Sequence, residues 1–167
     1  ANTLNISDLQ ALRESIQQQR KDAYAILNEL LLDEFINLKI QYEEVTWDTK
    51  KNKEGKSTKR PLTIADIEAL EPFHWGYEFS EIFTKKNGFD AIIANPPWEV
   101  FKPNAKEFFS VYSDKISKKN MTIKDFEKHQ SELLKDPELG GIWEEYLSRF
   151  SYQSQYFRSS LQFKNQI

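Results

Sequence analysis

A helical pattern of apolar residues near the start of the chain constrains its fold most. From residue 7 to about residue 45, apolar side chains recur at the three- and four-residue spacing of one helix face. Ser7 is a suitable N-cap, whereas a polar run at residues 17–22 interrupts the face. The pattern predicts either one long helix with a polar middle turn or two helices that meet there. The face consists of Leu9, Leu12, Ile16, Ala23, Leu27, Leu30, Leu31 and Leu38.

Most of the remaining chain is also expected to be helical. Residues 62–71 predict a short helix that ends at Pro72. Asn104 and Thr122 are suitable caps for two more helices, and a last helix follows Pro137. Within that last helix, the pair Gly140-Gly141 predicts a break or a tight contact.

A short β element is expected in the middle of the chain. Residues 73–83, "FHWGYEFSEIF", are rich in aromatics and partly alternate, which favours a strand followed by a turn. Residues 89–94 form an apolar run between Gly88 and a pair of prolines, typical of a short buried strand. Two short strands make no stable sheet alone. Either protein outside this chain completes the sheet, or the strands pack on the helices as a minor element.

A basic stretch lies between the N-terminal helical segment and the β element. Residues 48–60, "DTKKNKEGKSTKR", carry six basic side chains and no large apolar one, which predicts a linker or loop. The stretch is either a solvated loop or a contact for nucleic-acid phosphates. The predicted organisation is an N-terminal helical segment 1–47, a basic linker 48–61, a β element 62–104 and a C-terminal helical segment 105–167. The basic side chains are Lys50, Lys51, Lys53, Lys56, Lys59 and Arg60.

Composition excludes several classes of protein. The 167 residues include no cysteine, so disulfides and thiolate metal sites are excluded. The two histidines, His74 and His129, have no metal-binding spacing. No apolar run approaches the length of a membrane span, and a cytoplasmic location is expected. The net charge of −3 argues against coating of nucleic acid by overall charge, but not against a local basic contact.

The tetrapeptide Asn95-Pro96-Pro97-Trp98 follows the apolar run and needs a chemical reason. The Asn95 side chain carries an acceptor oxygen and an amide donor. Pro97 restricts Pro96 to extended geometry, which directs the Pro96 carbonyl outward, and Trp98 provides a flat face for stacking. Two acceptors beside a stacking face suit a planar group with an exocyclic amino group. When both N–H groups donate hydrogen bonds to these acceptors, the nitrogen lone pair is left free to attack an electrophile.

The segment "FDAIIANPPW" resembles the catalytic signature of amino-methylating, S-adenosylmethionine-dependent methyltransferases. The upstream "FHWGYEFSEIF" is similar to a His-Trp…Glu-Phe segment of adenine-specific DNA methyltransferases from restriction-modification enzymes. The resemblance implies that Asn95 and the Pro96 carbonyl hold the adenine amino group and that Trp98 stacks on the flipped-out base. Phe101 and Lys102, just past the motif, could contact the base or the DNA backbone. Double-stranded DNA is the implied partner.

The sequence shows no sign of the half of such an enzyme that binds the cofactor. The glycines lie at positions 55, 76, 88, 140 and 141, and none forms the glycine-rich loop that would bind S-adenosylmethionine. We therefore expect a partial segment of an α/β Rossmann-like methyltransferase domain, mostly α with a short β element. Such a segment would be inactive alone and would need the missing remainder of its catalytic domain.

Two alternatives remain open from the residues. Enzymes that methylate glutamine side chains or RNA bases share the Asn-Pro-Pro motif, so the acceptor could differ, although Trp98 and the upstream segment favour DNA. The chain could instead be a helical protein-interaction module in which residues 89–98 form a structural turn.

Overall fold

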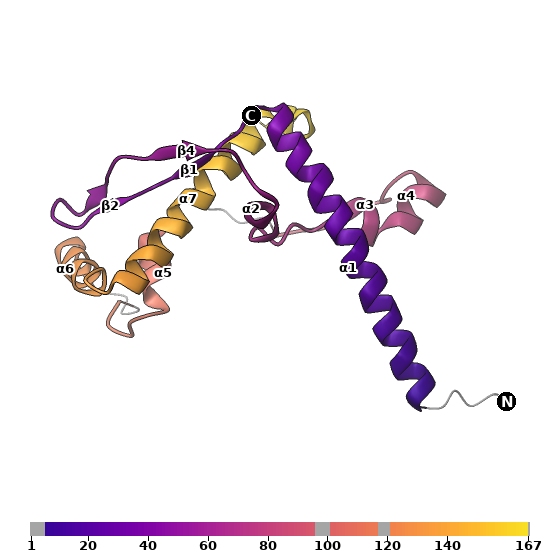
Figure 1. Ribbon diagram of the computed structural model, residues 1–167, viewed down its shortest axis with the longest axis horizontal. Coiled ribbons are helices and arrows are strands. Elements are labelled where there is room, and N and C mark those ends of the chain that lie inside the picture. The colour runs from indigo at the N-terminus through magenta and orange to yellow at the C-terminus, as the bar shows by residue number, and fades with distance from the viewer. Residues whose placement is uncertain (1–5, 96–100, 117–120, 167) are drawn as a thin grey trace. The chain divides into compact units, whose positions relative to one another are not determined.

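The computed structural model describes residues 6–95, 101–116 and 121–166, and of residues 164–166 the backbone only. Its contacts divide the chain into two compact units. The first unit contains the helices α1 to α4. The second contains the strands β1 to β4, the helices α5 to α7 and a final 3₁₀ helix, η1 (Figure 1). The described chain is mostly helical, as expected, with small two-stranded sheets.

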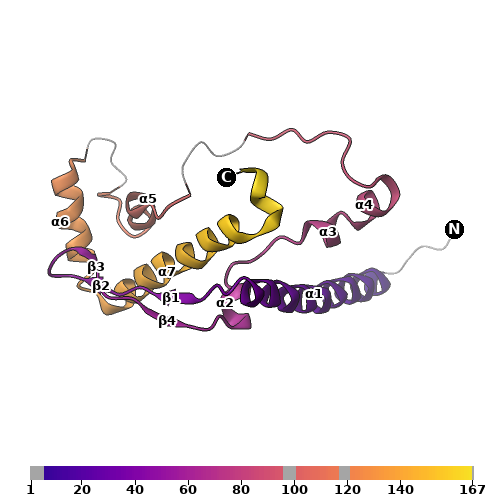
Figure 2. The ribbon, with the colours of Figure 1, turned by 90° about the horizontal axis from the view of Figure 1, so that it is seen from above.

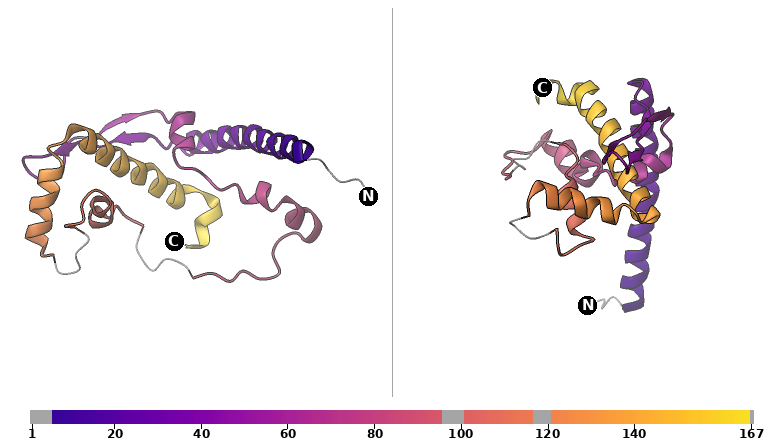
Figure 3. Two further views of the ribbon diagram at one scale, coloured as in Figure 1. Left: turned by 90° about the horizontal axis from the view of Figure 1, so that it is seen from below. Right: turned by 90° about the vertical axis from the view of Figure 1, so that its left-hand side faces the viewer.

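The first unit is built on one long helix. Helix α1 (Ile6–Asn37) runs without interruption through the polar residues 17–22, so the one-helix alternative is confirmed (Figure 3). It ends earlier than the predicted residue 45, because Lys39 adopts a positive φ of 57° that a continuing helix does not allow. Leu38 therefore lies outside the helix. Helix α2 (Ile64–Glu68) contacts α1, and Phe35 and Ile67 are buried in this unit.

The strand predicted at residues 73–83 is wrong. This segment forms two short helices, α3 (Trp75–Glu78) and α4 (Ser80–Lys86). Asn87 ends α4 in the left-handed conformation, with φ 59°, a backbone region that asparagine tolerates better than most residues. The next predicted strand, residues 89–94, forms no strand either. A strand needs a neighbour to pair its backbone groups, and no described strand pairs with this run.

The basic stretch is not a linker but most of a β-hairpin. Strand β1 (Tyr42–Glu44) pairs antiparallel with β4 (Thr58–Arg60), and β2 (Trp47–Asp48) pairs with β3 (Lys53–Glu54). Between the two ladders, residues 45 and 46 face residues 55–57, which makes a bulge. Asp48 shapes the turn, since its Oδ1 accepts the backbone N–H groups of Lys50 (3.0 Å) and Lys51 (3.1 Å).

Glycine is required at the bulge. The backbone N–H of Gly55 donates to the Thr46 carbonyl at 2.8 Å. A Cβ at position 55 would lie 2.6 Å from the Thr46 Oγ1, which itself donates to the Lys56 carbonyl at 2.7 Å. The close approach of the two arms therefore leaves no room for a side chain at this position.

The hairpin packs on α7 (Pro137–Ser159), as both Figure 1 and Figure 2 show. The buried Ser148 hydroxyl accepts the Val45 N–H at 2.9 Å, and Glu144 Oε1 accepts the Trp47 N–H at 2.7 Å. Hydrogen bonds of this kind satisfy backbone donors that the bulge removes from the ladders. The core of this unit contains Val45, Phe109, Ile116, Leu134, Leu139, Trp143 and Leu147.

Two of the three C-terminal helices follow their predicted caps, Asn104 and Thr122. Asn104 caps α5 (Ala105–Ser110), Thr122 caps α6 (Ile123–Leu133) and Asp136 caps α7, each by accepting a backbone N–H of the first turn. The break or tight contact expected at Gly140-Gly141 is wrong. Both glycines lie inside the continuous α7, and a Cβ at either would meet no atom within 4 Å. Helix η1 (Leu161–Gln166) follows α7.

Candidate active site

Helix α3 and its N-cap contact α1 through polar side chains. His74, the N-cap of α3, places its Nε2 at 2.7 Å from Oδ1 of Asn28. One turn later, Glu78 Oε1 accepts the Tyr24 hydroxyl at 2.6 Å and forms an ion pair with Arg20. These contacts join segments that lie 46 and 54 residues apart in the sequence.

The polar contacts define the state of His74. Because Asn28 presents its acceptor oxygen, Nε2 carries the proton and donates. Partial burial lowers the pKa of His74, and the negative charge of Glu78 raises it to a smaller extent. The pKa thus lies below its usual value of 6.5, and the ring is neutral at pH 7. His74 is therefore a packed, hydrogen-bonded histidine.

Aromatic side chains on and next to α3 and α4 form a cluster with Phe89. Trp75 stacks on Phe79, with ring centroids 5.4 Å apart and planes inclined by 26°. Phe89 meets Phe79 edge-on at 5.1 Å and Phe83 at 5.6 Å, and Phe73 meets Trp75 at 4.9 Å. We call Phe73, Trp75, Phe79, Phe83 and Phe89 the aromatic cluster. Edge-to-face and offset contacts of this kind are the favoured geometries of aromatic pairs.

The spacing of the His-Trp…Glu-Phe segment explains this division. His74 and Glu78 lie four positions apart, and so do Trp75 and Phe79. On a helix, residues four apart share one face, so one pair meets α1 while the other meets Phe89. The aromatic alternation that suggested a strand therefore also fits a helix with one polar and one aromatic face.

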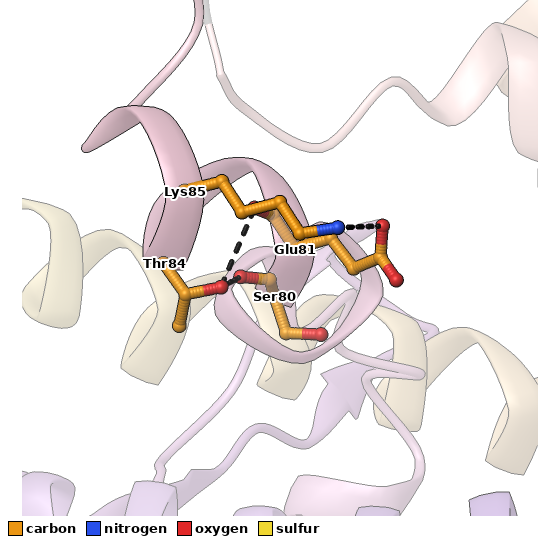
Figure 4. Close-up of polar contacts among 4 residues, drawn as sticks. All are labelled: Ser80, Glu81, Thr84 and Lys85. Carbon is orange, nitrogen blue, oxygen red and sulfur yellow. Dashed lines mark hydrogen bonds and ion pairs between the residues drawn. The ribbon is translucent and has the colours of Figure 1, made fainter.

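Phe83 of α4 belongs to the aromatic cluster, whereas other side chains of α4 bond one another on its surface. Figure 4 shows Glu81 paired with Lys85 at 3.2 Å on the exposed side of the helix. In the same view, the Thr84 hydroxyl lies 2.6 Å from the Ser80 carbonyl and 3.3 Å from that of Glu81. Glu81 is therefore a surface residue.

The predicted catalytic motif begins six residues after the aromatic cluster. Asn95 is exposed, and so are Ile92 and Ile93 before it, at 79% and 98% of their surface. The other predicted catalytic residues, Pro96, Pro97 and Trp98, lie outside the described residues. Phe89, held by its ring contacts in the cluster, is the last cluster residue before Asn95.

Phe101 and Lys102, the predicted nucleic-acid contacts past the motif, belong to the second unit. Phe101 packs on Phe150 at 4.9 Å and on Phe157 at 5.3 Å. Both residues line a cleft of about 290 Å³ beside the hairpin and α7, together with Glu43 and Ser151. The cleft combines aromatic, hydroxyl and charged groups.

The predicted basic contacts differ in how much the fold uses them. Lys50, Lys51 and Lys59 are exposed on the hairpin, and Lys51 lies 3.7 Å from the Asp48 carboxylate. The Arg60 guanidinium instead covers the ring of Tyr42, 3.8 Å from its centroid, and donates to the Pro61 carbonyl at 3.1 Å. The hairpin thus displays lysines while Arg60 has a structural role.

The glycines of this chain do not form a loop that would hold S-adenosylmethionine. Gly55 lies in the hairpin bulge, Gly76 inside α3 and Gly88 after α4, while Gly140 and Gly141 lie inside α7. None stands between a strand and a following helix, the place at which a nucleotide-type cofactor meets backbone N–H groups. Among the described residues, no group of histidine and carboxylate side chains could hold a metal ion. No helix in the described part of the chain is long and apolar enough to cross a membrane.

Comparison with known proteins gives the family. The sequence matches the Eco57I restriction-modification methylase family over residues 5–167, and the chain belongs to that family. It is 43% identical over 61 residues to a protein of Methanocaldococcus jannaschii named "Putative type II restriction enzyme and methyltransferase". That match covers 36% of this chain and 5% of the relative, so it spans a small part of the relative's length. No solved structure matches the chain.

Proposed function

We propose that this chain is the substrate-side segment of a DNA methyltransferase that methylates the exocyclic amino group of adenine from S-adenosylmethionine. The observation that carries the proposal is the family match over residues 5–167, which includes the Asn95-Pro96-Pro97-Trp98 motif. The ring contacts of Phe89, six residues before the exposed Asn95, support it. A restriction-modification or phage-defence system in the cytoplasm is the setting that we propose.

The proposed chemistry is hydrogen-bond acceptance and stacking. The Asn95 carbonyl oxygen and the Pro96 carbonyl accept the two N–H protons of the adenine amino group, and Trp98 stacks on the base after it leaves the duplex. Acceptance of both protons keeps the nitrogen lone pair directed at the methyl group. No covalent nucleophile takes part, which agrees with a chain that has no cysteine.

The methyl donor would bind outside this chain. The glycines of this chain lie in a bulge, in helices and in a turn, which gives no reason to place the cofactor on these residues. We therefore propose that the isolated chain is inactive and acts with the remainder of its catalytic domain. The exposed Ile92 and Ile93 agree with an apolar run that pairs with strands of that remainder.

The hairpin is the proposed DNA contact of this segment. Lys50, Lys51 and Lys59 would meet backbone phosphates, and Phe101 and Lys102 would meet the base or the backbone near the motif. Such phosphate contacts would make binding fall steeply with salt concentration. Arg60 contributes less, because its guanidinium already covers Tyr42.

The test is transfer of labelled methyl groups to duplex DNA by the longer protein that carries this segment. We expect label on adenine, and a loss of roughly a hundredfold or more in Asn95→Ala, the size of effect seen when a preorganised polar contact to a reacting group is removed. Asn37→Ala, an exposed asparagine at the end of α1, is the matched control and should retain activity. Activity of Asn95→Ala within a few-fold of the wild type would refute the assigned role.

A second candidate is a helical protein-interaction module. It is favoured by exposed apolar side chains on α1, among them Leu12 at 53% and Ile16 at 56%. The methyl-transfer assay separates the two candidates. Label on RNA or protein but not DNA would change the acceptor, and a longer protein that does not bind S-adenosylmethionine would leave only the interaction module.

A further inference from the structure

We propose that Asn28 and His74 are positioning residues of the active site. Their hydrogen bond holds α3 on α1, and through α3 it holds the aromatic cluster and the segment that leads to Asn95. This inference rests on the proposed function, because it assigns to two residues distant from the motif an effect on methyl transfer.

Asn28 is an unusual choice for its place in α1. Asparagine is a poor helix former, yet Asn28 lies in the interior of a 32-residue helix and exposes only 7% of its surface. A buried amide needs a partner, and His74 provides it at 2.7 Å. The asparagine at position 28 therefore contributes more through its hydrogen bond to His74 than through helix propensity.

A second contact one turn away sets the register of α3 on α1. Tyr24 precedes Asn28 by four positions on α1, and Glu78 follows His74 by four positions. The Tyr24 hydroxyl donates to Glu78 at 2.6 Å, and the Glu78 carboxylate also pairs with Arg20. The Tyr24 ring additionally meets the His74 ring edge-on at 4.9 Å. Two hydrogen bonds one turn apart fix both the position and the rotation of α3.

The position of α3 reaches the motif through the aromatic cluster. Trp75 and Phe79 leave α3 beside the two polar residues, and both contact Phe89, at 6.5 and 5.1 Å between ring centroids. Phe89 is six residues before Asn95. A shift of α3 therefore moves the point from which the chain runs to Asn95. Since a displacement of about 1 Å can cost roughly a hundredfold in rate, loss of the Asn28–His74 contact should lower kcat.

The experiment compares four variants of the longer protein. Asn28→Ala removes the acceptor, and His74→Asn places an amide at the wrong distance. His74→Gln places its amide nitrogen near the position of Nε2 and should restore the bond to Asn28. Gln18→Ala is the matched control, because Gln18 is an exposed α1 residue that bonds only Asp22 on its own helix in the described contacts. The readouts are kcat, KM for DNA and the Kd for S-adenosylmethionine.

We expect kcat to fall roughly tenfold or more in Asn28→Ala and His74→Asn. KM and donor binding should change little, and His74→Gln and Gln18→Ala should stay within a few-fold of the wild type. A purely structural role would lower the amount of folded protein and leave kcat of the folded fraction unchanged. Wild-type kcat in Asn28→Ala, or equal losses in the two His74 variants, would overturn the inference.

Two further measurements keep the inference separate from the proposed function. If Asn28→Ala fails to fold, Tyr24→Phe removes only the hydroxyl that donates to Glu78, and unchanged kcat in that variant counts against the inference. If the wild-type protein transfers no methyl groups, the proposed function fails, and hydrogen exchange on this 167-residue chain decides whether the contact holds α3. Faster exchange at residues 75–86 in Asn28→Ala supports the contact, and unchanged exchange refutes it.

Discussion

At the scale of single residues, Glu43 illustrates how one carboxylate joins separate parts of the second unit. Its Oε1 accepts the Ser57 hydroxyl at 2.6 Å, and its Oε2 accepts the Ser151 hydroxyl of α7 at 2.9 Å. The bonds from Ser57 and Ser151, with the charge of Lys59, lower the pKa of Glu43 against a smaller opposing effect of burial. The carboxylate thus links both arms of the hairpin to the helix.

The lowered pKa predicts an acid-dependent loss of stability. A carboxylate whose pKa is lower in the folded protein stabilises the fold above its unfolded value of 4.5, and this contribution is lost as pH falls through the folded pKa. We therefore expect Glu43→Gln to lower the free energy of unfolding at pH 7, by no more than about 1 kcal/mol because solvent screens the site. The difference from the wild type should shrink below pH 4.5. Urea unfolding at pH 7 and pH 3.5 measures it, with Glu54→Gln, an exposed hairpin residue, as control. A difference that stays constant across this range would contradict the assignment.

Some site residues could be predicted from local sequence and others could not. The chemistry of Asn95 and Trp98 was suggested by their residue types and by the two prolines between them. The contacts of Asn28 and Tyr24 could not be anticipated, because both residues stand in a helix that matched a simple apolar pattern. Their partners lie 46 and 54 residues away, and only the folded chain brings them together. The sequence signal that could have drawn attention to the site is an asparagine inside an apolar helical pattern.

At the scale of elements, α7 contains two glycines in its interior that no contact requires. Gly140 and Gly141 lack neighbours at the Cβ position, and neither has a positive φ. Glycine costs about 0.5–1 kcal/mol relative to alanine inside a helix, mainly through the freedom of the unfolded chain.

We therefore predict that Gly141→Ala raises the free energy of unfolding by about 0.5–1 kcal/mol. Urea denaturation of the 167-residue chain measures the change. Gly55→Ala is the contrasting variant, because its Cβ would collide with Thr46 Oγ1, and it should destabilise the protein. A destabilised Gly141→Ala would contradict a continuous α7 at this position.

Element prediction succeeded where local signals agreed and failed where distant contacts decided. The caps Asn104 and Thr122 and the apolar periodicity were sufficient for α1, α5, α6 and α7. The lysine-rich residues 48–60 have little tendency to form strands, and their pairing depends on β1, which α7 holds through Ser148 and Ser151. Asp48 and Asn52 were available as turn signals, since Asn52 adopts φ 49°. In α3 the helical spacing brings His74 and Glu78 to α1, a contact between distant segments that local sequence does not show.

At the scale of the whole molecule, the two units have separate cores. Asn28 belongs to the first unit and Ser148 to the second. We predict that Asn28→Ala increases hydrogen exchange in α2, α3 and α4 and leaves α7 unchanged. Ser148→Ala, which leaves the Val45 N–H without its acceptor, should do the reverse and cost about 1–3 kcal/mol in the second unit. Exchange measured by mass spectrometry on each variant tests this, and a change that spreads over both units would refute their independence.

The hydrogen bond between Val45 and Ser148 spans 103 positions, and this separation matters during synthesis on the ribosome. The hairpin leaves the ribosome well before α7 is translated, at a pace of about 5–20 residues per second. For that interval its arms have no helix to rest on, and an isolated two-stranded hairpin is at best marginally stable. The hairpin must therefore remain unfolded, or only marginally folded, for several seconds until α7 follows.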